Sequence, residues 1–151
     1  MPAARPGKVS DCTAVYSMAR PRAFADSNIP LYLLSEDARK AAAARSVLHA
    51  HCAISVQVLN EITNVMHRKY QYTWGQIEHF LKTLRAQCLV EPLTEETHDT
   101  ARQFAERYQL QFYDALIAAA ALHAGCDTLY SEDMHHGLLL EGRLRVVNPF
   151  A

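Results

Sequence analysis

Closely spaced cysteines and long hydrophobic runs are both missing from this chain of 151 residues. Its cysteines, Cys12, Cys52, Cys88 and Cys126, are widely separated, so there is no C-x-x-C pair for zinc binding or thiol exchange. Such cysteines are typical of reduced, mostly buried thiols in a cytoplasmic protein. No apolar run approaches the roughly 18 residues that a membrane helix needs. The longest, ALIAAAALHAGC, is interrupted at Gly125 and predicts a core helix without membrane contact.

Repeats, low-complexity segments and Gly/Ser-rich linkers are also missing. Half of the residues are hydrophobic and 21% are charged, which is the composition of a globular domain and not of a disordered chain. A chain of this length is expected to fold as one domain around one core. The formal net charge is −1, so local basic patches or bound cations would have to supply any attraction to nucleic acid.

The N-terminal segment differs from the rest of the chain. It carries several basic residues and a weakly apolar stretch, but its polar content argues against a signal peptide. Met18 lies close to the first expected strand. We therefore expect residues 1–21 to form a loose extension ahead of a folded domain over residues 22–151.

Short apolar runs alternate with helical patterns along that domain. Strands are predicted at 22–27, 52–55, 88–93, 127–131 and 144–148, helices at 31–51, 55–71, 73–87, 94–110 and 113–125, and a short helical turn at 132–140. The expected helix N-caps are Ser35 or Asp37, then Ser55, Thr73 and Thr94. This alternation predicts an α/β fold, a three-layer sandwich with a central, mostly parallel sheet of four to five strands.

Four acidic residues lie at the edges of these elements. Asp26 ends the first strand, Asp114 begins the most apolar helix, and Asp133 follows the strand TLYS, which are places where ligands bind in parallel sheets. Glu61 lies inside a helix, beside its apolar stripe. Ordinary structural roles stay open for all four: helix cap for Asp26 and Asp133, surface residue for Glu61, and partner of the helix dipole for Asp114.

Carboxylates that face one another repel, and their pKa values rise unless a cation neutralises them. Oxygen ligands without paired cysteines or an H-x-x-x-H motif favour Mg²⁺, for which Mn²⁺ can substitute, over zinc. Such an ion can activate water and stabilise the charge that develops as a phosphodiester is cleaved. The sequence therefore predicts a metal site formed by Asp26, Glu61, Asp114 and Asp133.

Four segments carry a resemblance to a known family. ADSNI (25–29), NEITNV (60–65), YDALIAAAA (113–121) and YSEDM (130–134) are similar, in order and spacing, to the acidic motifs of the PIN domain in VapC-type toxin ribonucleases. The resemblance spans residues 23 to about 150. It implies a PIN-like, Mg²⁺-dependent endoribonuclease whose catalytic and metal-binding residues are Asp26, Glu61, Asp114 and Asp133.

The same motifs contain auxiliary polar residues. Ser27 and Asn28 follow the first acid, and Ser131 and Glu132 precede the last. The resemblance implies that Ser131 is the hydroxyl residue that helps to orient the site and that Asn28 is the polar residue after the first acid. Asp133 is preferred to Glu132 in the quartet because it has a counterpart in the motif, and Glu132 is expected to be an auxiliary carboxylate.

Partners follow from the resemblance and from nearby charges. Arg68 and Lys69 come about two turns after Glu61, and we expect them to contact RNA, although a solvated helix face explains them equally well. The resemblance implies an RNA substrate, a homodimer and a small cognate antitoxin protein that inhibits cleavage. Of the eight histidines, only His135 or His136 is expected near substrate phosphate. His49 and His51 are expected to be structural, and the other four to be surface or edge residues: His67, His79, His98 and His123.

Two other functions stay open at this point. A phosphotransferase similar to the haloacid dehalogenases would use Asp26 as its nucleophile, but it would want a D-x-D motif, and Asn28 occupies the third position. A non-catalytic PIN-like module would bind only a partner protein. An intact set of four acids argues against that module, because nothing but metal chemistry would hold the acids together.

Overall fold

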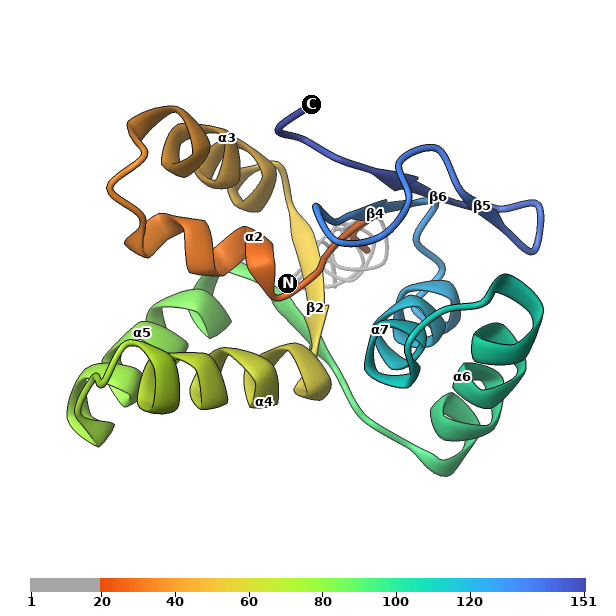
Figure 1. The fold of residues 1–151 in the computed structure, drawn as a ribbon, viewed down its shortest axis with the longest axis horizontal. Helices are drawn as coiled ribbons and strands as arrows, with labels where there is room; N and C mark the ends of the chain where they lie inside the picture. The colour runs from red at the N-terminus through yellow and green to blue at the C-terminus, as the bar shows by residue number, and fades with distance from the viewer. Residues whose placement is uncertain (1–19) are drawn as a thin grey trace, which may run out of the picture.

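The computed structural model describes residues 20–151, which Figure 1 shows as a ribbon. The expected N-terminal extension lies outside the described residues, apart from Arg20 and Pro21. The same is true of Cys12, whereas Cys52, Cys88 and Cys126 are buried free thiols, as predicted.

A six-stranded sheet forms the centre of the fold. Its strands are β1 (Ala23–Ala25), β2 (Cys52–Ser55), β3 (Leu89–Glu91), β4 (Thr128–Tyr130), β5 (Leu139–Leu140) and β6 (Leu144–Val147). Their order is β3-β2-β1-β4-β6-β5, and every neighbouring pair is parallel except β5 with β6. The predicted α/β class with a mostly parallel sheet is confirmed.

The segment 132–140 was wrongly predicted to be a short helical turn. It contains bends and ends in β5, so the sheet has one strand more than the largest number expected. The cause is the turn that follows, where Glu141 and Gly142 have φ values of 52° and 67° and allow a tight hairpin. β5 therefore pairs antiparallel with β6 in place of a helical turn.

Helices cover both faces of the sheet. They are α2 (Asn28–Leu31), the 3₁₀ helix η1 (Tyr32–Leu34), α3 (Ala38–His49), α4 (Val56–Asn64), the π-helix η2 (Val65–Lys69), α5 (Trp74–Gln87), α6 (Glu95–Tyr108) and α7 (Phe112–His123). Figure 1 shows α3 on one side of β2 and the pair α6 and α7 on the other. This arrangement produces the three layers that the sequence predicted.

Polar side chains fix where these helices begin. The side chain of Asp37 accepts backbone hydrogen bonds at the start of α3, which decides between the two caps expected there. Ser55, Thr73 and Thr94 cap α4, α5 and α6 in the same way, as predicted. The helix predicted over 55–71 is present, but its last part widens into η2.

The apolar helix α7 lies in the core. Its residues 115–121 are all buried, and five of these seven are alanines, whose small side chains let α7 pack closely on β2 and β4. Within residues 20–151, no helix is both long enough and apolar enough to cross a membrane.

Candidate active site

The carboxyl ends of β1 and β4 create one side of the site. Ala25 pairs with Tyr130 in the parallel register, so the next residues, Asp26 and Ser131, leave the sheet side by side. Both are buried, and the Ser131 hydroxyl donates a hydrogen bond of 2.6 Å to Asp26 Oδ2. The Ser27 amide donates to Asp26 Oδ1 at 2.7 Å. Asp26 is thus held by hydrogen bonds from two loops.

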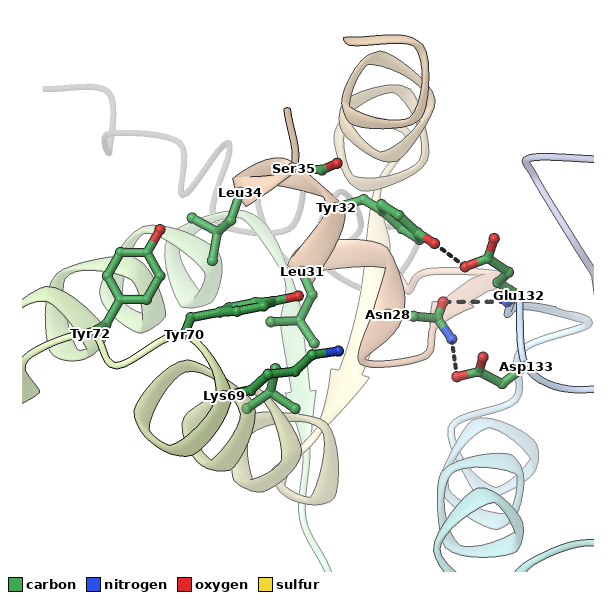
Figure 2. A pocket seen from close by; sticks show the side chains of 11 residues that line it. Asn28, Leu31, Tyr32, Leu34, Ser35, Lys69, Tyr70, Tyr72, Glu132 and Asp133 are labelled. Carbon is green, nitrogen blue, oxygen red and sulfur yellow. Dashed lines mark hydrogen bonds between the residues drawn. The ribbon is translucent and has the colours of Figure 1, made fainter. Parts of the chain in front are cut away.

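Asn28 connects these loops to Asp133 (Figure 2). Its Nδ2 donates to Asp133 Oδ2 at 2.9 Å and to Asp26 Oδ2 at 3.3 Å, and its Oδ1 accepts from the Glu132 amide at 3.3 Å. Ser131 Oγ also accepts from the Asp133 amide at 3.2 Å. The auxiliary roles predicted for Asn28 and Ser131 therefore have a geometric basis, since both side chains orient acids from separate segments.

Two helices supply the other acids. Glu61 lies on α4, which begins where β2 ends, and Asp114 lies in the first turn of α7. These helices pack against each other. Glu61 Oε2 is shielded from solvent and has no hydrogen-bond partner among the described residues. An unpaired carboxylate oxygen in such a place is costly, so Glu61 is not the surface residue of the ordinary interpretation.

Burial and mutual repulsion act on these acids together. Burial raises the pKa of Asp26 to about 6. Hydrogen bonds from Ser131 and Ser27 lower this pKa, and the charges of Asp114 and Asp133 raise it further. Burial also raises the pKa of Glu61 to about 7, and the other three acids add to the increase. The pKa of Asp114 is raised by burial and by Asp133. The structure thus brings the four acids into one electrostatic site.

The donor set fits a hard divalent cation in its chemistry. Four carboxylates with an unpartnered buried oxygen are the groups that Mg²⁺ and Mn²⁺ prefer. As arranged here, no three His, Cys, Asp or Glu side chains within residues 20–151 are close enough to hold a metal ion together. Binding such an ion would therefore require the carboxylates to move toward it.

Glu132 lies apart from the four acids. Its Oε1 accepts from Lys40 Nζ at 2.7 Å, its Oε2 accepts from the Tyr32 hydroxyl, and Lys40 also donates to that hydroxyl at 3.0 Å. Figure 2 shows the Glu132 carboxylate at Tyr32 and that of Asp133 at Asn28. Burial tends to raise the pKa of Glu132, but hydrogen bonds from Lys40 and Tyr32 hold it below its ordinary value.

A groove leads away from Asn28 and Asp133. It has a volume of about 560 Å³ and is lined by Asn28, Leu31, Tyr32, Leu34, Ser35, Val65, Lys69, Tyr70, Tyr72, Glu132 and Asp133. In Figure 2 the Lys69 side chain extends along the groove toward Asn28. Arg68 is exposed and does not line the groove, so only one of the two expected RNA contacts lies at the site.

Of the two histidines expected near the substrate phosphate, only His135 lies beside the acids. His135 lines a cavity of about 580 Å³ with Asp114 and Asp133, so it lies next to the acids. His136 has a structural contact instead, because its Nδ1 accepts a hydrogen bond from the Asn148 amide at 2.9 Å. His123 makes a hydrogen bond with Thr100.

Comparison with known proteins identifies the family. The family model of the PIN domain matches residues 23–136, and the chain belongs to this family, as its motifs predicted. A search of curated proteins gave no match.

Several solved structures share the fold, including the following three. A toxin-antitoxin complex from Klebsiella pneumoniae is 21% identical with a TM-score of 0.64, covering 84% of this chain and 97% of that one. VapC20 of Mycobacterium tuberculosis, a toxin that cleaves the sarcin-ricin loop, is 18% identical with a TM-score of 0.61, covering 74% and 89%. VapBC2 of Rickettsia felis, bound to a DNA fragment from its promoter, is 18% identical with a TM-score of 0.54, covering 74% and 86%.

Proposed function

We propose that this protein is a Mg²⁺-dependent endoribonuclease that acts as a VapC-type toxin. The proposal is supported by the electrostatic influence that Asp26, Glu61, Asp114 and Asp133, from four separate segments of a PIN domain, have on one another. Burial and the charges of neighbouring acids raise the pKa values of Asp26, Glu61 and Asp114, so the ionised site is unfavourable without a cation. Binding of a metal ion would remove the unfavourable free energy of these ionised carboxylates.

Each residue has a role in this proposal. Asp26, Asp114, Asp133 and Glu61 would hold the ion. A bound Mg²⁺ would supply an activated water and neutralise charge on the phosphodiester. Ser131 and Asn28 keep Asp26 and Asp133 oriented through their hydrogen bonds. Lys69, which lines the groove, would contact an RNA phosphate.

Chelation tests the proposal. The purified protein should cleave RNA in Mg²⁺, lose cleavage in EDTA, and regain it when Mn²⁺ is added in excess. Cleavage is measured by gel electrophoresis of end-labelled total RNA, which also maps the cut sites. RNA cleavage that continues undiminished in EDTA contradicts the proposal, and a trapped phosphate ester on Asp26 would favour the phosphotransferase instead.

We also propose that a cognate antitoxin binds the groove beside Asp133. The groove has an apolar wall that includes Leu31, Leu34 and Val65, and carboxylates at one end. An amphipathic peptide whose apolar side fills the groove and whose arginine reaches the carboxylates would match both features. Several structural neighbours are toxin-antitoxin complexes, which supports a partner of this kind.

Co-expression tests the partner. The small protein encoded beside this chain should co-purify with it and block RNA cleavage, and Leu34→Asp should release it. Light scattering on the free protein tests the homodimer that we propose as its functional form. Failure of every neighbouring small protein to co-purify would contradict the antitoxin.

A further inference from the structure

A second pocket adjoins the acidic site on the side of α4 and α7. It has a volume of about 460 Å³ and is lined by Gln57, Asn60, Glu61, Asn64 and Tyr113. The residues from α4 are spaced three or four positions apart, so they share one face of the helix. Glu61 belongs both to this pocket and to the acidic site, which makes the two continuous.

Three side-chain amides line this pocket. Within residues 20–151, the side chains of Gln57, Asn60 and Asn64 make no hydrogen bond with another residue. Exposed amides such as those of Asn60 and Asn64 bond to water, but Gln57 is only 8% exposed and still lines the pocket. No amide atom of Gln57 is among the shielded, unpartnered side-chain atoms of residues 20–151, so its amide is reached through the pocket, like those of Asn60 and Asn64. All three amides can therefore exchange water for a ligand that enters the pocket.

The chemistry of the lining selects the class of ligand. An amide offers a donor and an acceptor side by side, as do the edges of nucleobases. The Tyr113 ring is 62% exposed and offers a face for stacking, the usual way in which proteins bind unpaired RNA bases. The pocket contains no lysine or arginine, and Glu61 would repel a phosphate. A neutral, flat, polar ligand fits better than an anionic one.

We propose that this pocket is a nucleobase subsite that holds one unpaired base of the RNA next to the cleaved phosphodiester. Tyr113 stacks on the base, and Asn60, Asn64 and Gln57 bind its edge. The inference rests on the proposed ribonuclease function and deepens it, because it assigns to these residues part of the sequence preference of cleavage.

The test uses a short single-stranded RNA with one mapped cut site, and a series of the same RNA lacking one base at each position in turn. For the native protein, one abasic position should raise KM by about 5- to 150-fold, the range that stacking of a base covers. Tyr113→Ala should raise KM for the intact RNA by a similar factor and remove the dependence on that base, while kcat changes little. Asn60→Ala should do the same to a smaller extent.

A matched control comes from Trp74, which is exposed to the same 62% at the start of α5 but does not line the pocket. Trp74→Ala should retain the dependence on the base. The subsite is wrong if this dependence persists in both Tyr113→Ala and Asn60→Ala, if Trp74→Ala abolishes it, or if light scattering shows that the Tyr113 variant only separates two copies of the chain. If the native protein cleaves no RNA in Mg²⁺ or Mn²⁺, the proposed function fails first, and the subsite fails with it.

Discussion

The two sides of the acidic site are held in different ways. On the side of the strand ends, Asp26 accepts hydrogen bonds from Ser27, Asn28 and Ser131. On the side of the helices, Glu61 has a shielded oxygen with no hydrogen-bond partner within residues 20–151. The strand side is therefore oriented by hydrogen bonds from the protein itself, whereas the helix side places a carboxylate oxygen where a ligand would satisfy it. Residues on the strand side thus orient the site, whereas Glu61 on the helix side has an oxygen available to a ligand.

The largest expected effect is the loss of cleavage when either side loses its charge. Asp26→Asn and Glu61→Gln keep the shape of the side chains but remove a carboxylate from the cation site. Each should lower kcat/KM for RNA by more than about 100-fold, beyond the 10- to 100-fold typical of groups that only support a ligand. Cleavage rates determined by gel electrophoresis measure this loss of kcat/KM.

Glu78→Gln is the control, because Glu78 is an exposed residue of α5 that pairs with Lys82 on the same helix. It should retain the native rate. Full activity in Asp26→Asn would show that the acids cap helices and take no part in cleavage. Full activity in Glu61→Gln alone would show that the acids on the strand side are sufficient for cleavage.

Much of this arrangement could be predicted from the sequence because it depends on local patterns. Apolar runs that stop at Asp26 and after Tyr130 indicated strands of a parallel sheet, and the carboxyl ends of such strands meet at one edge. The hydroxyl of Ser55 at the start of α4 indicated where the helix carrying Glu61 begins.

The remaining details depend on contacts between distant residues. Asn28 reaches Asp133 across 105 positions, and Lys40 reaches Glu132 across 92. A two-residue strand such as β5 carries no periodicity of its own and exists because β6 pairs with it. The amide pocket beside Glu61 was missed for a related reason, since asparagine and glutamine on a helix usually face water.

A second prediction concerns how the stability of the metal-free protein, kept in EDTA, changes with pH. The folded pKa of Asp26 is about 6, above its ordinary 3.8, so the folded chain binds more protons than the unfolded chain between these values. Rising pH through this interval therefore destabilises the fold, and the cost is absent below pH about 4 and complete above pH about 7. It amounts to about 3 kcal/mol for Asp26, and the raised pKa of Glu61 acts in the same direction.

Urea unfolding of the native protein and of Asp26→Asn at about pH 4.5, 6 and 7.5 measures this effect. The stability of the variant relative to the native protein should rise with pH, because the amide never ionises. Added Mn²⁺ should stabilise the native protein at the higher pH and stabilise the variant much less. A difference between the two proteins that is independent of pH would contradict the raised pKa of Asp26.

The smallest expected effect concerns Glu132, which adjoins Asp133 in the sequence but is bound by Lys40 and Tyr32. Because that carboxylate is already satisfied, Glu132→Gln should change the Mn²⁺ affinity measured by calorimetry by at most about twofold. Ser131→Ala is the contrasting variant, since it removes the hydrogen bond to Asp26, and it should weaken Mn²⁺ binding by about 10- to 100-fold. A tenfold loss in Glu132→Gln would instead place Glu132 among the metal-binding acids and extend the strand side by one carboxylate.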